Sequence, residues 1–148
     1  FCTATVFRLI AELSGYDRER VQALRMSADA WFHITRAGGS FGFHNHPMAS
    51  WSGIYCVDNG YGDNAGVDSG HVQFMHPAPT AGMFVDLGVA NVRAPWANQP
   101  KEMALMSGQL VVFPSWVMHQ VLPFTGTQER VTVAFNAWFK DVGAGAAT

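Results

Sequence analysis

Eight short, strand-like segments dominate this sequence from residue 30 to residue 139. Gly-rich or Pro-rich turn clusters, such as Gly38-Gly39 and Pro77 to Gly82, separate the segments. The predicted strands span 30–36, 41–46, 51–58, 71–76, 101–106, 109–113, 118–123 and 129–139. Many short strands joined by such turns are typical of a jelly roll, in which two sheets close over a barrel-like interior. The sequence therefore predicts an all-β double-stranded β-helix.

The residues before this series have a helical pattern. Apolar residues recur at helical spacing over residues 4–14, and Asp17 to Met26 is predicted to form a second, shorter helix. We expect both helices to pack outside the sheets. The chain is thus predicted to be one domain, with a helical part at about 1–28, a β-helix core at about 30–140 and a flexible tail at 141–148. The long stretch 77–100 is a candidate lid.

Composition narrows the class of protein. The chain has 148 residues, of which 49% are hydrophobic and 14% charged, so a globular fold with a real core is expected. The net charge of −2 favours no nucleic-acid partner, and the apolar runs are too short for a membrane span. Cys2 and Cys56 form no disulfide framework, and no signal peptide is visible, so we expect reduced thiols and a cytoplasmic location.

Three histidines suggest a metal site. His44 and His46 stand two residues apart on a predicted strand and should project from the same face. His119 opens a later strand, after the turn that follows Pro114, and a jelly roll would direct it toward the same interior. Together the three imidazoles could hold one metal ion in a facial arrangement.

The last predicted strand, 129–139, alternates regularly. Arg130 and Thr132 lie on the face that should point toward the metal. Burying a guanidinium there without an acidic partner would be costly, and a carboxylate ligand would supply that partner. The alternative is an exposed Arg130 paired with Glu129. The Tyr55 hydroxyl could complete the carboxylate pocket, and His33 could contact substrate, although a structural role is favoured for His33.

These motifs, taken in order, resemble a known family. The matching pieces are His44-Asn-His-Pro47, Ser52-Gly-Ile-Tyr55, Phe113-Pro-Ser-Trp-Val-Met-His119 and Glu129-Arg-Val-Thr-Val-Ala-Phe-Asn136. They are similar to motifs of the 2-oxoglutarate–Fe(II) oxygenases, over residues 30–139. The resemblance implies an enzyme that couples oxidation of a small-molecule or peptide substrate by dioxygen to decarboxylation of 2-oxoglutarate. The implied cofactors are Fe(II) and 2-oxoglutarate, and a homodimer is an open possibility.

The resemblance also implies roles for residues. His44 and His119 correspond to the two metal histidines, Arg130 and Thr132 to the clamp for the distal carboxylate, and Tyr55 and Asn136 to motif positions expected near the co-substrate. Beyond the metal ligands no catalytic side chain is predicted. His46 occupies a position where the wider superfamily usually has Asp or Glu. Either His46 is the third ligand, or a carboxylate such as Asp58, Asp63, Asp68 or Asp86 replaces it.

Two other classes of protein stay open. The same histidines are similar to the metal motifs of cupins, and a three-histidine cupin dioxygenase needs no 2-oxoglutarate. Arg130 favours the first interpretation, because a cupin does not require it. The third class is a ligand-binding jelly roll without catalysis, which the five tryptophans would suit.

Overall fold

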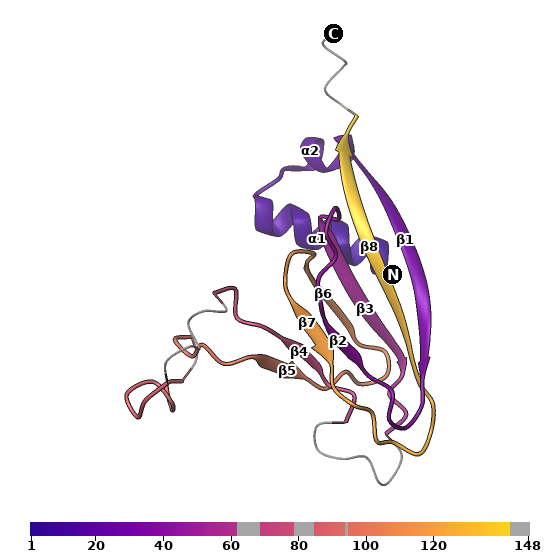
Figure 1. Ribbon diagram of the computed structural model, residues 1–148. Helices are drawn as coiled ribbons and strands as arrows, with labels where there is room; N and C mark the ends of the chain where they lie inside the picture. The colour runs from indigo at the N-terminus through magenta and orange to yellow at the C-terminus, as the bar shows by residue number, and fades with distance from the viewer. Residues whose placement is uncertain (62–68, 79–84, 94, 143–148) are drawn as a thin grey trace.

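A computed structural model describes residues 1–61, 69–78, 85–93 and 95–142 (Figure 1). Two helices precede eight strands: α1 (Cys2–Ser14), α2 (Arg18–Ala23), β1 (Leu24–Thr35), β2 (Phe41–His44), β3 (Trp51–Asp58), β4 (Val72–Phe74), β5 (Lys101–Met103), β6 (Leu110–Pro114), β7 (His119–Val121) and β8 (Arg130–Asp141). They form two four-stranded antiparallel sheets, with strand orders β1-β8-β3-β6 and β2-β7-β4-β5. The predicted double-stranded β-helix is confirmed.

The helix α1 covers the outer face of the first sheet. Val6 and Ile10 of α1 pack with Phe135 and Ala137 of β8, all with little or no exposed surface. Gly15 ends the helix in a left-handed conformation, with φ 63°, which glycine adopts without steric cost. The predicted outside position of this helix is therefore confirmed, and it leaves the other face of the sheet to form the interior.

The boundary between the helical and β parts differs from the prediction. The second helix ends at Ala23 rather than near residue 26, and β1 starts at Leu24, so the helical part is shorter than 1–28. The reason is tertiary: β1 pairs with β8 continuously from Leu24↔Asp141 to Thr35↔Arg130, and this ladder outweighs local helix propensity.

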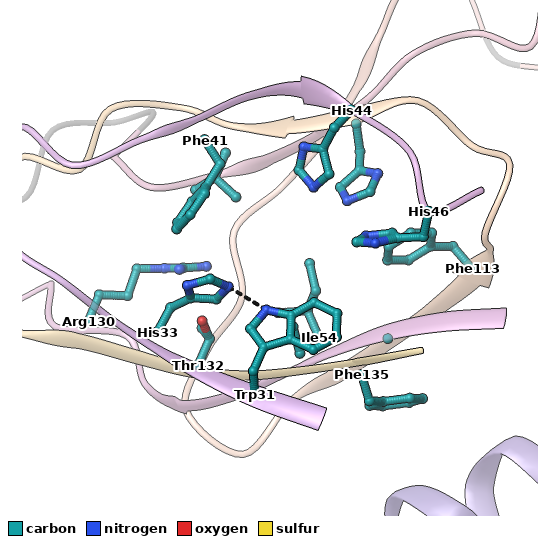
Figure 2. A pocket seen from close by; sticks show the side chains of 14 residues that line it. Trp31, His33, Phe41, His44, His46, Ile54, Phe113, Arg130, Thr132 and Phe135 are labelled. Carbon is teal, nitrogen blue, oxygen red and sulfur yellow. Dashed lines mark hydrogen bonds between the residues drawn. The ribbon is translucent and has the colours of Figure 1, made fainter. Parts of the chain in front are cut away.

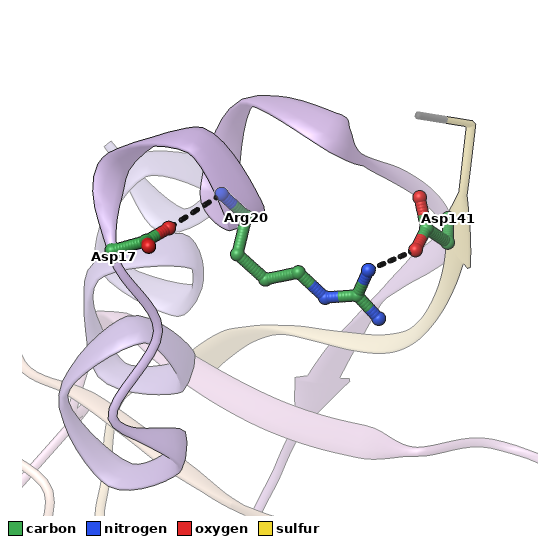
Figure 3. Close-up of polar contacts among 3 residues, drawn as sticks. All are labelled: Asp17, Arg20 and Asp141. Atoms are coloured by element: carbon green, nitrogen blue, oxygen red, sulfur yellow. Dashed lines mark hydrogen bonds and ion pairs between the residues drawn. The ribbon is translucent and has the colours of Figure 1, made fainter. Parts of the chain in front are cut away.

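The C-terminal boundary differs too. Asp141 belongs to β8 and forms an ion pair with Arg20 of α2, and Asp17 caps α2 by accepting from the Arg20 backbone N–H at 2.8 Å (Figure 3). The predicted tail therefore cannot begin at 141, and residues 143–148 lie outside the described part. Residues 79–84 and 94 of the predicted lid also lie outside it. Within the described residues, no helix is long and apolar enough to cross a bilayer.

Alternate residues of β8 point to the two faces of the first sheet. Its residues Phe135 and Ala137 face α1, whereas Arg130 and Thr132 face the interior between the sheets, as the alternation predicted. The interior core consists of Ile54, Cys56, Val72, Leu105, Phe113 and Val121. These apolar side chains surround the polar groups of the candidate site.

Candidate functional site

A cavity of about 260 Å³ lies between the two sheets (Figure 2). Its lining consists of Trp31, His33, Phe41, His44, His46, Gly53, Ile54, Phe113, His119, Val121, Arg130, Thr132, Ala134 and Phe135. Three histidines gather at one end, and the Arg130 guanidinium occupies the other. Apolar and aromatic walls with a few convergent polar groups are typical of small-molecule sites.

The three predicted metal ligands come together. His44 ends β2 and is the cross-strand partner of His119, which begins β7. His46 follows two residues after the end of β2, so the prediction that it lies within the strand is wrong. Its backbone N–H nevertheless donates to the Ser115 carbonyl at 3.0 Å, which fixes the chain there. One ligand atom from each histidine lies within 4.8 Å of the others.

Hydrogen bonds orient two of the imidazoles. His44 Nδ1 lies 2.7 Å from the Gly42 carbonyl, and His119 Nδ1 lies 3.0 Å from the Val117 carbonyl. A carbonyl only accepts, so both Nδ1 atoms carry the proton and both Nε2 atoms present a lone pair. Such bonds to the second nitrogen are usual for metal-bound histidines.

Burial favours the neutral forms of His46 and His119. Burial, and secondarily the charges of His44 and His46, lower the pKa of His119 to about 4. Burial and the charge of His44 also lower the pKa of His46. Protons therefore compete weakly for the His46 and His119 nitrogens at neutral pH, and imidazole donors fit a divalent first-row metal ion.

Arg130 is a buried cation without an acidic partner among the described residues. Its side chain is 2% exposed, and its Nη2 atom has no hydrogen-bond partner in the part of the chain that the structure describes. Glu129, the alternative partner considered from sequence, instead forms an ion pair with Arg36 at 2.5 Å. Burial lowers the pKa of Arg130. Among the described residues, no anion offsets the desolvation of this guanidinium.

A second polar atom without a partner lies near Arg130. The Tyr61 hydroxyl is buried and, among the described residues, makes no hydrogen bond. Burial raises the pKa of Tyr61, and the charge of Arg130 opposes that rise. Gly70 allows the close packing around Arg130: an added Cβ there would lie 3.1 Å from Arg130 Cδ, and its φ of 63° is unfavourable for other residues. Two orphaned donors fit a carboxylate group of a bound ligand.

The other residues predicted for the co-substrate have different positions. Thr132 lines the cavity beside Arg130. Tyr55 is not among the lining residues; its ring contacts the ring of Phe1, with centroids 6.1 Å apart. Neighbouring residues on a strand point to alternate faces of the sheet. Tyr55 therefore points to the outer face, whereas Ile54 and Cys56 point to the interior. The structure does not bring Tyr55 to the carboxylate end of the cavity.

Asn136 belongs to a buried hydrogen-bond chain. Ser52 donates to Asn136 Oδ1 at 2.7 Å, so the Ser115 hydroxyl, 2.8 Å from Ser52 Oγ, must be the donor to Ser52. The Ser115 carbonyl accepts the N–H of His46. Asn136 is not among the residues that line the cavity, and the chain connects β8, β3 and the β6–β7 turn to the backbone of a candidate ligand.

A carboxylate ligand is absent from the described cluster, which contains the three histidines alone. The Asp58 carboxylate accepts from the Gly60 N–H and that of Asp86 from the Gly88 N–H, both as turn contacts. Asp63 and Asp68 lie outside the described residues.

Local sequence patterns do not single out Tyr61 near Arg130, nor Trp31 and Phe41 in the cavity wall. Tyr61 follows Asn59-Gly60, a dipeptide typical of a surface turn, so nothing local distinguishes it. Trp31 and Phe41 line the cavity but belong to no motif; Trp31 is only one of the five tryptophans that would suit a ligand-binding jelly roll. The missing signal is the pairing of β1 with β8, which places Trp31 opposite Ala134 and His33 opposite Thr132.

Comparison with known proteins assigns the family. Residues 29–136 match the family model described as "Putative 2OG-Fe(II) oxygenase". The chain belongs to this family, as its motifs indicated. No curated protein matches the sequence significantly.

Several solved structures share the fold. They include a prolyl-4-hydroxylase from Pseudomonas putida (TM-score 0.51, 20% identity, covering 82% of this chain and 55% of that one). A 2OG-Fe(II) oxygenase family oxidoreductase from Burkholderia pseudomallei has a TM-score of 0.56 at 13% identity, with coverages of 88% and 50%. EvdO2 from Micromonospora carbonacea var. aurantiaca has a TM-score of 0.55 at 16% identity, with coverages of 98% and 63%. The chain thus spans about half to five-eighths of the length of these proteins.

Proposed function

We propose that this chain is the catalytic domain of an Fe(II)- and 2-oxoglutarate-dependent oxygenase. His44, His46 and His119 would hold the iron, and Arg130 with Thr132 would bind the distal carboxylate of 2-oxoglutarate. The observation that carries this proposal is Arg130, a buried cation that has no acidic partner in the described part of the chain and faces the same cavity as the histidines. The orphaned Tyr61 hydroxyl adds a third donor, in the role first expected for Tyr55.

The protein residues would position the reactants and exclude water. When bound, iron and 2-oxoglutarate supply the redox chemistry, which couples dioxygen reduction and decarboxylation of 2-oxoglutarate to oxidation of a substrate. His44 and His119 present Nε2 lone pairs in fixed orientations. Arg130 would fix the position of the co-substrate through paired hydrogen bonds. Phe41, Ile54 and Phe113 form apolar walls that limit access of water.

The first experiment measures co-substrate binding without oxygen. We expect 2-oxoglutarate to bind in calorimetry only when Fe(II) or an inert divalent ion is present. Arg130→Met should weaken binding roughly tenfold or more, because a bidentate charged contact contributes ~1.5–3 kcal/mol. The matched control, Arg36→Met, changes an exposed arginine and should leave the affinity unchanged. Unchanged affinity in Arg130→Met would contradict the proposal.

The three-histidine ligand set supports one alternative, a cupin-type dioxygenase without 2-oxoglutarate. Such an enzyme would bind metal in the same place but would not bind 2-oxoglutarate through Arg130, so the same titration distinguishes the two. A protein that binds no metal would favour a non-catalytic ligand-binding jelly roll. A homodimer and a cytoplasmic location remain predictions; unpaired Cys2 and Cys56 support the latter.

A further inference from the structure

His33 lies on the cavity wall between Arg130 and the histidine cluster. Strand β1 presents Trp31 and His33 on the same inner face, opposite Ala134 and Thr132 of β8. The Trp31 indole Nε1 lies 2.8 Å from His33 Nε2, and the two rings are nearly perpendicular, at 89°. Figure 2 shows Trp31 on the side of His46 and the Arg130 guanidinium beside His33.

The bond from Trp31 determines the protonation of His33. An indole N–H can only donate, so His33 Nε2 must accept with its lone pair. A neutral imidazole has one proton, which must then be on Nδ1. Burial, followed by the charges of Arg130 and His44, lowers the pKa of His33, which favours the neutral ring.

The Nδ1–H group of His33 has no hydrogen-bond acceptor among the described residues. Among the described residues, the bond from Trp31 is the one hydrogen bond of the His33 side chain. Phe41 makes an edge-type contact with the ring at a centroid distance of 4.5 Å, and its side chain has no oxygen or nitrogen that could accept. A neutral N–H donor therefore lies beside the guanidinium of Arg130, at the end of the cavity away from the metal ligands.

We propose that His33, held by Trp31, is a further donor to the distal carboxylate of 2-oxoglutarate and helps select a dicarboxylic 2-oxo acid. The inference rests on the proposed function. A carboxylate has two oxygens with about four acceptor positions, so it can accept from His33 Nδ1–H in addition to the Arg130 fork. Trp31 acts as a positioning residue, because it directs the His33 proton toward that end of the cavity.

The test compares two ligands that differ only in the distal group. 2-Oxopentanoate has the same 2-oxo acid group as 2-oxoglutarate but ends in a methyl group. Affinities of both are measured by calorimetry without oxygen, on protein loaded with Zn(II). His33→Ala should lower the affinity for 2-oxoglutarate roughly tenfold, as expected for the loss of a hydrogen bond to a charged group. It should lower the affinity for 2-oxopentanoate less than about twofold. His33→Asn, whose amide can donate from near the Nδ1 position, should recover most of the loss.

Controls separate this role from a structural one. His71→Ala makes the same change outside the cavity lining and should affect neither ligand. If His33→Ala lowers the affinity for both ligands equally, or lowers neither affinity, the inference is wrong. If Arg130→Met lowers the affinity for 2-oxoglutarate and His33→Ala does not, the proposed function stands and only the inference fails. If the metal-loaded wild type binds no 2-oxoglutarate, both fail.

A second readout needs neither metal nor ligand. Nitrogen-15 NMR of the metal-free protein should show His33 with Nδ1 protonated and Nε2 unprotonated. Trp31→Phe removes the donor and should produce a mixture of the two tautomers, with a smaller loss of 2-oxoglutarate affinity than His33→Ala causes. A protonated Nε2 in the wild type would overturn the assignment.

Discussion

At the scale of single residues, Arg130 is a buried cation without an acidic partner in the described part of the chain, and the proposed function assigns it a bound anion. A buried cation without an anion destabilises the folded chain, and a hydrophobic replacement of similar size removes that cost. Binding sites often carry such a compromise. The ligand-free protein is therefore expected to be less stable than its fold allows.

This compromise predicts the effect of Arg130→Met on stability. Without ligand, the free energy of unfolding should stay the same or rise by about 1–3 kcal/mol. Urea unfolding of the metal-free protein measures it, with Arg36→Met as the surface control, expected to stay within about 0.5 kcal/mol. A loss of more than about 1 kcal/mol in Arg130→Met would mean that Arg130 has a stabilising partner.

His46 is the residue at which this chain departs from the usual two-histidine, one-carboxylate set. If His46 is a ligand, His46→Asp restores that set and should retain metal, whereas His46→Ala should lose much more. Equilibrium dialysis against Zn(II) or Fe(II) measures both variants. Equal losses of metal affinity in the two variants would indicate that His46 does not bind the metal directly. Substitution of residues that contact the ligands also lowers metal affinity, by roughly 10–100-fold.

His119 predicts a pH dependence of stability for the metal-free protein. Its folded pKa of about 4 is below the ordinary 6.5, so the unfolded state binds more protons between these values. The stability contribution is complete above about pH 6.5 and is lost as the pH falls toward 4. Urea unfolding between pH 7 and 4.5 should show a smaller slope in His119→Gln than in the wild type. Identical slopes would contradict the assigned shift.

At the scale of elements, the chain Asn136–Ser52–Ser115 connects separate strands to the backbone of His46. Ser52→Ala should cost about 1–3 kcal/mol of stability, because it leaves two buried polar groups without their partner. It should also weaken metal binding, since Ser115 holds the backbone N–H of His46. Ser50→Ala, at an exposed position just before β3, is the matched control. An unchanged metal affinity in Ser52→Ala would limit the chain to a structural role.

The strands and the histidine cluster were predictable because they depend on local patterns. The alternation of β8 predicted that Arg130 and Thr132 face the interior, and the histidine spacing predicted that three imidazoles come together. The start of β1 was not predictable, because its pairing with the distant β8 decides it. The position of Tyr61 was not predictable for the same reason, because its burial near Arg130 depends on packing between segments that are distant in the sequence.

At the scale of the whole molecule, two sheets bring a histidine cluster and a cationic end into the same cavity. The first sheet contributes Arg130 and Thr132, and the second contributes His44 and His119. Neither sheet contains both groups. The pairing of a three-histidine cluster with a distant cationic end distinguishes the proposed oxygenase from a three-histidine cupin.

The central claim is that a metal ion and 2-oxoglutarate bind in this cavity together. A crystal structure grown without oxygen, with Fe(II) and 2-oxoglutarate, tests it most directly. We expect one ion bound by imidazole nitrogens of His44, His46 and His119 at about 2.0–2.2 Å, by analogy with zinc sites. We also expect the distal carboxylate to bind the Arg130 guanidinium. A carboxylate side chain in place of His46 would contradict the ligand assignment, and 2-oxoglutarate bound away from Arg130 would contradict the proposed function.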